Sequence, residues 1–336
     1  MVYQALPGTD MRVSKISLGT WPFGGGAYWG DQSEKDALDT VDVSIANGIN
    51  FFDTAMTYGK GVSEEILGRA LKGRRQNNII ATKAVWEALH KDKLEAACDA
   101  SLKRLQTDYI DLYYIHWISK DTVLEDTMEV MERLRDKGKI RMAGICNFGV
   151  NRLRALRKSG KLEMFKAHQL PYSLLWRPIE YEVAPETVQD GMGIVCYSPL
   201  FQGLLTGIYH SIDEVPMGLR GTRLYDCSNR TDTQHHEKGC EKEVFLALDQ
   251  IRALAGDMGV SMAELSLAWL LHKPGVVSVI TGARTPKEIK ENVKAADLRL
   301  SSDVMAKLSE ITQPILQAVG NNCDMWMSKS DSRYDL

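Results

Sequence analysis

The stretch GINFFDTAMTYGK, residues 48–60, places an apolar run directly before two polar residues, Asp53 and Tyr58. Two later runs have the same form, because NIIATK ends at Lys83 and DLYYIH ends at His116. Short runs of β-branched and aromatic residues are typical of buried strands. When parallel strands close into a barrel, their carboxyl ends meet at one rim, where active sites are built. The four polar side chains are therefore predicted to share that rim, and the chain is predicted to be an enzyme.

Eight such runs alternate with segments of helical periodicity. In one of these segments Ala37, Val41 and Ile45 recur every four residues, with Ser33 as a suitable N-cap and Gly48 as the expected stop. The predicted strands are Ile16–Leu18, Ile49–Phe52, Ile79–Thr82, Leu112–Ile115, Ile140–Gly144, Ala167–Leu170, Ile194–Cys196 and Val276–Ile280.

A second helix is expected after Ser63. It carries Glu64 and Glu65 in its first turn and Arg69 late, before Gly73. This charge order complements the helix dipole at both ends and supports the helical interpretation.

Strict alternation of β and α segments predicts a parallel sheet covered by helices. Eight units favour an α/β fold closed as a (β/α)8 TIM barrel over an open doubly wound sheet. The glycine run at 24–26 lacks the GxGxxG spacing of a dinucleotide fingerprint, so it is interpreted as a flexible rim loop. We expect a single domain over 1–336, with a hairpin at 1–15 under the barrel, an insertion loop after the seventh strand at 207–240 and a C-terminal tail at 312–336.

The composition is that of an ordinary globular protein, with 44% hydrophobic and 25% charged residues. The net charge of −3 provides no positive field for nucleic acid or anionic lipid. No apolar run approaches the ~20 residues that span a bilayer. The six cysteines lack a CxxC pair, which favours reduced thiols in a cytoplasmic protein. His235 and His236 are adjacent, and because successive residues rarely converge on one ion, no metal site is predicted.

The residues at the predicted rim suit proton transfer to a carbonyl oxygen. A lysine ammonium beside Tyr58 would stabilise the phenolate and lower the phenol's pKa from its usual value of about 10. Asp53 would hold Lys83 charged, and His116 would orient the carbonyl. No side chain supplies a hydride, so a nicotinamide cofactor is needed. Taken singly, Asp53 could be a helix N-cap and His116 a packed rim histidine; their joint placement favours catalysis.

The segment DTAMTYGKGVSEEILGRAL, followed by ATK and DLYYIH, resembles the signature set of the aldo-keto reductases. The segments YQALPGTDMRVSKISLGTW, KIRMAGICNFG, HQLPYSLL, YSPLFQGLLTG and GARTPKEIKENVKAA also have counterparts, so the resemblance runs almost end to end. It implies a barrel that reduces aldehydes and ketones with NAD(P)H bound across the rim, without a Rossmann fold. It further implies that Tyr58 is the general acid, that Lys83 and Asp53 adjust the pKa of Tyr58, and that His116 orients the substrate.

The resemblance also implies a set of cofactor contacts. Asn147 and Gln169 match the pair that hydrogen-bonds the nicotinamide carboxamide, and Tyr197 matches the aromatic residue that stacks on the ring. The other matches are Ser198, Leu200 and Gly203 around the pyrophosphate, and Gly282, Arg284, Thr285, Glu288, Glu291 and Asn292 around the adenosine end.

The last of these segments favours NADPH as the cofactor. Thr285 and Glu288 form a predicted capping box with Pro286 in the first helical position, and Arg284 suits a phosphate. NADH is the alternative, because Glu288 stands where similar sequences have glutamine and would repel a 2′-phosphate. Cys146 stands where a serine is usual, which removes a hydroxyl beside the carboxamide.

Four tryptophans that follow strand ends, Trp21, Trp29, Trp86 and Trp117, offer hints about the substrate. They could wall a pocket for an aldehyde, ketone or sugar carbonyl, or they could pack as a cover. The expected partner is a small molecule, not nucleic acid or a membrane, and the oligomeric state is left open. Two alternative functions remain: a regulatory or scaffold subunit of the same fold, like the potassium-channel β subunits, and a phosphate-binding barrel isomerase.

Overall fold

The computed structural model describes residues 1–26, 29–230 and 232–334. Positions 27–28 of the predicted rim loop, 231 of the insertion loop and 335–336 of the tail therefore lie outside the described residues.

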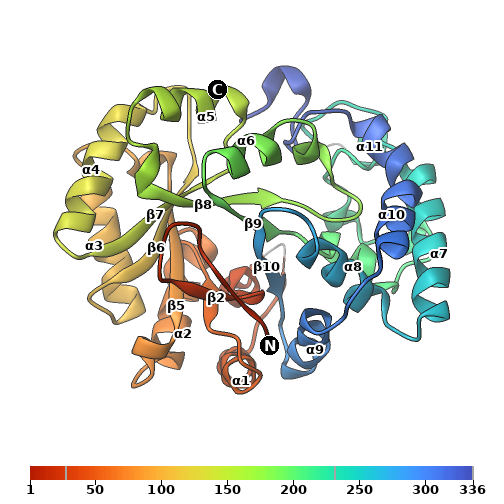
Figure 1. Ribbon diagram of the computed structural model, residues 1–336, viewed down its shortest axis with the longest axis horizontal. Coiled ribbons are helices and arrows are strands. Elements are labelled where there is room, and N and C mark those ends of the chain that lie inside the picture. Colours follow the sequence, from red (N-terminus) through yellow and green to blue (C-terminus); the bar gives the residue numbers. More distant parts are fainter. Residues whose placement is uncertain (27–28, 231, 335–336) are drawn as a thin grey trace.

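Eight parallel strands close into a barrel in the order β10-β3-β4-β5-β6-β7-β8-β9 (Figure 1). Each of the eight predicted runs forms one of these strands, so the (β/α)8 prediction is confirmed. The strands are β3 (Ile16–Gly19), β4 (Phe51–Asp53), β5 (Ile79–Val85), β6 (Ile110–Trp117), β7 (Ile140–Cys146), β8 (Phe165–Pro171), β9 (Gly193–Tyr197) and β10 (Val276–Gly282).

Helices cover the outside of the barrel between consecutive strands (Figure 1). The first follows Ser33, whose hydroxyl accepts a hydrogen bond from the Asp36 amide, and ends before Gly48, which has a φ of 83°, as predicted. Among the described residues no single helix is long and apolar enough to cross a bilayer. The pair α7 (Glu241–Asp257) and α8 (Met262–Leu271) passes that test only when joined, and the two helices bend by 94° at the break. The helices are α1 (Glu34–Ala46), α2 (Val62–Ala70), α3 (Leu94–Leu105), α4 (Leu124–Asp136), α5 (Val150–Lys158), α6 (Val183–Gln189), α7 (Glu241–Asp257), α8 (Met262–Leu271), α9 (Pro286–Asn292), α10 (Ser302–Ile311) and α11 (Gln313–Val319).

The predicted N-terminal hairpin is present. Strand β1 (Tyr3–Ala5) pairs antiparallel with β2 (Arg12–Ser14). Leu6, Met11 and Val13 are buried against inward-facing residues of the barrel strands, so the hairpin forms the floor of the barrel interior.

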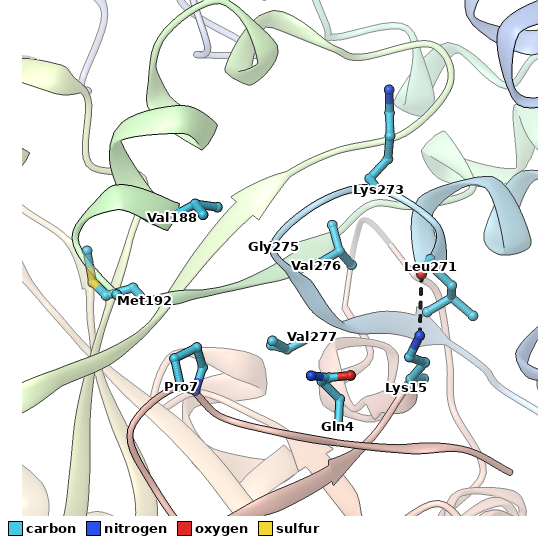
Figure 2. A pocket seen from close by; sticks show the side chains of 11 residues that line it. Gln4, Pro7, Lys15, Val188, Met192, Leu271, Lys273, Gly275, Val276 and Val277 are labelled. Atoms are coloured by element: carbon cyan, nitrogen blue, oxygen red, sulfur yellow. Dashed lines mark hydrogen bonds between the residues drawn. The ribbon is translucent and has the colours of Figure 1, made fainter. Parts of the chain in front are cut away.

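A pocket of about 360 Å³ lies where the hairpin meets the start of β10, at the amino end of the barrel (Figure 2). Gln4, Pro7, Lys15 and Val277 are among the residues that line it, and Lys15 Nζ donates to the Leu271 carbonyl at 3.5 Å. The carboxyl ends of the strands, with the predicted catalytic residues, lie at the opposite end of the barrel.

Alternate residues of each strand point into the barrel, because side chains in a strand alternate between its two faces. Ile79 of β5, and Leu112 and Tyr114 of β6, belong to the interior cluster. Lys83 lies an even number of residues after Ile79, and His116 lies an even number after Leu112. Both side chains therefore point inward too, at the rim end of their strands. The strand pattern thus delivers both polar side chains to one end of the interior.

The start of α2 differs from the prediction. The helix begins at Val62, so Ser63 lies inside its first turn, where its buried hydroxyl donates at 2.7 Å to the backbone carbonyl that follows β3. Glu64 is fully buried and accepts hydrogen bonds from the Thr82 hydroxyl and from Arg104, both at 2.6 Å. These side chains attach α2 to the barrel, in addition to any effect on the helix dipole.

The predicted insertion loop, 207–240, forms short 3-10 turns in its described part, and some of its side chains are buried. Arg223 is only 5% exposed, and its guanidinium donates to the carbonyls of Val319 and Asn322 at 2.9 and 3.0 Å. Its backbone N–H donates to the Met325 carbonyl at 2.8 Å. The loop therefore holds the C-terminal tail, whose first residues form helix α11.

Gly68 marks the place where α2 crosses the end of α3. A Cβ added there would lie 2.6 Å from the Leu105 carbonyl carbon and 2.7 Å from the Arg104 carbonyl oxygen, and backbone cannot yield without moving the helix. We predict that Gly68→Ala lowers the free energy of unfolding in urea by about 1–3 kcal/mol. Gly256→Ala in α7 is the matched control: its Cβ would have no neighbour within 4 Å, so it should raise stability by about 0.5–1 kcal/mol. Equal effects at the two sites would contradict the proposed tight contact.

Candidate active site

The ammonium group of Lys83 lies at the centre of the rim. The side chain is fully buried, and Nζ donates to Asp53 Oδ1 at 2.5 Å, to the Thr54 carbonyl at 2.7 Å and to the Tyr58 hydroxyl oxygen at 3.2 Å. An ammonium has three hydrogens, and these acceptors account for all of them. Burial opposes the charge, but Asp53 and then Tyr58 more than offset it and raise the pKa of Lys83 above its usual value. Lys83 is therefore a cation at neutral pH.

Tyr58 is oriented by this contact. Because Lys83 donates to the phenol oxygen, the phenol's own hydrogen is directed elsewhere and can serve another acceptor. The prediction that Lys83 lowers the phenol's pKa below its usual value is wrong. Burial raises the pKa of Tyr58 to about 12, and the Lys83 charge opposes that rise without overcoming it. Tyr58 is therefore a protonated phenol across the physiological pH range.

His116 lies across from Tyr58, with ring centroids 6.2 Å apart and ring planes at 81°. Burial, and after it the charge of Lys83, hold the pKa of His116 well below its usual range, so the imidazole is neutral. Its Nδ1 is buried and has no hydrogen-bond partner among the described residues. A neutral imidazole with an unsatisfied nitrogen is suited to hydrogen-bond a substrate oxygen.

Two side-chain amides lie beside this group. Gln169 in β8 donates from Nε2 to Asp53 Oδ2 at 2.8 Å. Asn147, directly after β7, donates from Nδ2 to the His116 carbonyl at 3.2 Å and accepts at Oδ1 from the Tyr197 hydroxyl at 2.9 Å. The structure thus brings the three predicted nicotinamide contacts together with the predicted catalytic residues.

Cys146 lies under this part of the rim. It is buried in the barrel interior and pairs in register with Gln169. Burial raises the pKa of the Cys146 thiol well above its usual value, so the thiol is neutral.

The backbone at the predicted cofactor positions is strained. Among the described residues seven that are not glycine have a positive φ, and four of them follow β7 or β9: Asn147 (59°), Ser198 (52°), Phe201 (44°) and Gln202 (56°). Left-handed backbone is unfavourable for residues with a side chain, and such strain concentrates at functional sites. Two of these residues, Asn147 and Ser198, are predicted cofactor contacts, and their binding role stays a prediction.

Comparison with known proteins decides the family. The family model described as "Aldo/keto reductase family" matches residues 15–313. The chain belongs to the aldo/keto reductase family. It is 32% identical over 330 residues to the NADH-specific methylglyoxal reductase of Escherichia coli (strain K12), covering 91% of this chain and 97% of that protein. It is 30% identical over 330 residues to a probable voltage-gated potassium channel subunit beta of Arabidopsis thaliana, and the match covers 93% of this chain and 97% of that protein. The crystal structure of an aldo-keto reductase from Klebsiella pneumoniae in complex with NADPH superposes on this chain with a TM-score of 0.74 and 29% sequence identity. The match covers 93% of this chain and 96% of that chain.

In this member of the family the predicted helix cap after β10 is present, since Thr285 accepts a hydrogen bond from the Glu288 amide. The Glu288 carboxylate accepts from the Arg284 amide at 2.9 Å and from the Thr285 hydroxyl at 3.3 Å. The Arg284 guanidinium donates to the Asp31 carbonyl at 2.7 Å and to Gln32 Oε1 at 3.2 Å. The loop after β3 therefore reaches across to the end of β10, a contact that the sequence did not predict.

The other predicted cofactor residues lie after the carboxyl ends of β9 and β10, and their roles stay predictions. They are Ser198, Leu200 and Gly203, all partly buried in the turns after β9, Gly282 at the end of β10, Glu291, which is exposed, and Asn292, which is buried.

Three of the four predicted tryptophans join a row of ring contacts along the rim. Trp29 lies edge-on to Trp21 at 5.3 Å between centroids, and Trp21 stacks on Tyr58 at 5.9 Å. Trp117 lies 6.4 Å from His116. Trp86 is 42% exposed in a 3-10 turn after β5 and shares no described ring contact with this row.

The glycine run between Trp21 and Trp29 is tightly packed at its first residue, so it is not simply a flexible loop. A Cβ added to Gly24 would lie 2.5 Å from the backbone nitrogen of Gly59, which follows Tyr58 in the chain. Glycine at position 24 therefore allows the turn that carries Trp21 to approach the loop that carries Tyr58.

Sequence reasoning missed the end of the tail. Earlier in the tail, Met325 is buried and Trp326 is partly buried. The residue that reaches the site is Tyr334, whose hydroxyl donates to Asn147 Oδ1 at 2.8 Å and whose ring lies 6.1 Å from Trp117. The available signal was one aromatic residue among polar residues, in the segment SDSRYD.

Proposed function

We propose that this chain is an NADPH-dependent carbonyl reductase for an aldehyde, ketone or sugar carbonyl, with Tyr58 as general acid in reduction and as general base in the reverse reaction. The observation that carries the proposal is the fully hydrogen-bonded ammonium of Lys83. It leaves the Tyr58 hydrogen available as a neutral donor, opposite the unsatisfied imidazole of His116. Membership of the aldo/keto reductase family supports the same chemistry.

The chain's own residues handle the proton. Bound nicotinamide cofactor supplies the hydride. His116 hydrogen-bonds the carbonyl oxygen and holds it beside Tyr58. As that oxygen gains negative charge, Tyr58 transfers its proton to it. Lys83 already contacts the phenol oxygen and so stabilises the phenolate as it forms, an interaction that is strongest when the charge is fully developed.

The residues at the rim fit a nicotinamide dinucleotide. Asn147 and Gln169 would hold the carboxamide, Tyr197 would contact the ring, and Arg284 suits a 2′-phosphate because its planar fork matches phosphate geometry. One similar solved structure contains NADPH, whereas a similar reductase is NADH-specific. The Glu288 carboxylate is engaged by the helix cap, which reduces its repulsion of a phosphate. We therefore propose NADPH as the preferred cofactor, with weaker use of NADH.

A second candidate function is a nucleotide-binding regulatory subunit, supported by the similarity to a probable potassium channel subunit beta. Both functions are compatible with the same four catalytic residues, so turnover separates them. Steady oxidation of NADPH with a small aldehyde over many cycles supports the reductase, whereas oxidation of one equivalent supports the regulatory subunit. The isomerase alternative is set aside because the chain belongs to the aldo/keto reductase family.

Removing the phenol tests the proposed acid. Tyr58→Phe should lower kcat for carbonyl reduction by about 10²–10⁴-fold, the usual contribution of a positioned general acid. NADPH affinity, measured by quenching of protein fluorescence, should change little, because the phenol lies at the reacting end of the site. Full activity in this variant would exclude Tyr58 as the acid.

The pKa shifts predict the pH dependence of reduction. Tyr58 is protonated below its raised pKa of about 12, and His116 is neutral above its lowered pKa. Neither group titrates between about pH 6.5 and 9, so the hydride-transfer rate in single-turnover stopped-flow experiments should vary by less than about threefold over that range. A tenfold fall per pH unit above about pH 8 would instead show that Lys83 acidifies the phenol, as the sequence suggested.

Removing the guanidinium tests cofactor preference. Arg284→Ala should raise the Kd for NADPH by about tenfold or more and the Kd for NADH by less than about twofold, because only NADPH carries the 2′-phosphate. Gln32→Ala is the control, since it removes one partner of Arg284 but keeps the positive charge, and it should affect both cofactors alike. Equal losses of the two cofactors in Arg284→Ala would contradict the phosphate role.

A further inference from the structure

The end of the C-terminal tail is held firmly against the rim. The Arg333 guanidinium donates to both carboxylate oxygens of the fully buried Asp324, at 2.8 and 2.7 Å, and lies 4.0 Å from the centroid of the Trp117 ring. The Gly149 amide donates to the Tyr334 carbonyl at 2.8 Å. Tyr334 is therefore anchored through its own backbone and through its neighbour, and its buried side chain has a defined position.

The hydrogen bonds around Asn147 determine which way its amide faces. The His116 carbonyl can only accept, so the atom that faces it at 3.2 Å must be Nδ2. Oδ1 then accepts from the hydroxyls of Tyr197 at 2.9 Å and Tyr334 at 2.8 Å, which uses both of its lone pairs. Burial raises the pKa of both phenols well above the usual value, so both remain donors. The group that Asn147 retains for a ligand is its second N–H.

The side-chain amide of Gln169 leaves the opposite kind of group for a ligand. Asp53 Oδ2 is an acceptor, so the Gln169 atom 2.8 Å from it must be the Nε2 donor. This leaves the Gln169 carbonyl oxygen as the acceptor of the pair. One amide therefore presents a donor and the other an acceptor, the complement of a primary carboxamide, which has one carbonyl and one NH₂ group.

We propose that Tyr334 is a positioning residue for the nicotinamide end of the cofactor. Together with Tyr197 it fixes the Asn147 amide so that an N–H faces the carboxamide carbonyl. This assignment rests on the proposed function. It adds the C-terminal tail to the cofactor site, through a residue that touches the amide and not the reacting atoms.

The test removes only the hydroxyl. Tyr334→Phe leaves Asn147 Oδ1 with one donor, so its amide can tilt away from the bound orientation. The Kd for NADPH, from fluorescence quenching, should rise about 5–20-fold, and the KM for NADPH should rise with little change in kcat. Binding of 2′,5′-ADP, which lacks the nicotinamide, should change by less than about twofold. Tyr3→Phe is the matched control, because it removes a hydroxyl bonded to the Gly48 carbonyl at 2.8 Å at the other end of the barrel.

A double-mutant cycle shows whether Tyr334 acts through Asn147. In an Asn147→Ala background, Tyr334→Phe should cause no further loss of NADPH affinity, whereas independent effects would add. Additive losses, a parallel loss of 2′,5′-ADP binding, or unchanged or tighter NADPH binding by Tyr334→Phe would each overturn the assignment. Wild-type protein that binds no NADPH would instead overturn the proposed function, and this assignment with it.

Discussion

The ammonium of Lys83 is the group on which the rest of the site depends. A buried charge is costly unless its hydrogens are satisfied and a counter-charge is close. Here a carboxylate, a backbone carbonyl and a phenol oxygen receive its three hydrogens. Asp53 and Lys83 come from neighbouring parallel strands, and both face inward. A one-residue slip in either strand would turn one of the pair away from the interior and leave the other unpaired.

This ion pair also organises the predicted cofactor site. The second oxygen of Asp53 accepts from Gln169, and the carbonyl of His116 accepts from Asn147. The proposed acid and Gln169 therefore share one hydrogen-bonded group around Lys83 and Asp53, and Asn147 joins it through its backbone N–H, which donates to the Gln169 carbonyl at 3.1 Å. The residues proposed for proton transfer and the predicted cofactor contacts therefore lie side by side on the same rim.

Local patterns predicted the parts of the fold that local physics determines. The eight strands follow from apolar runs, and the caps at Ser33 and Thr285 follow from hydrogen bonds between residues three apart. The convergence of the four predicted catalytic residues could be foreseen because strand ends share a rim. The pKa of Tyr58 could not, since it depends on whether burial or a nearby charge dominates, and that balance exists only in three dimensions. Long-range partners were missed for the same reason: Arg223 and Tyr334 look like ordinary polar-segment residues until the tail crosses the rim.

The opposite positions of the hairpin and of Tyr334 have a practical consequence for anyone who handles this protein. The hairpin of β1 and β2 floors the barrel, whereas Tyr334 lies against Asn147 at the other end. A fluorescent label or immobilising group attached beside Tyr334 would begin next to the predicted catalytic residues. The same group attached to the hairpin would leave that end of the barrel undisturbed.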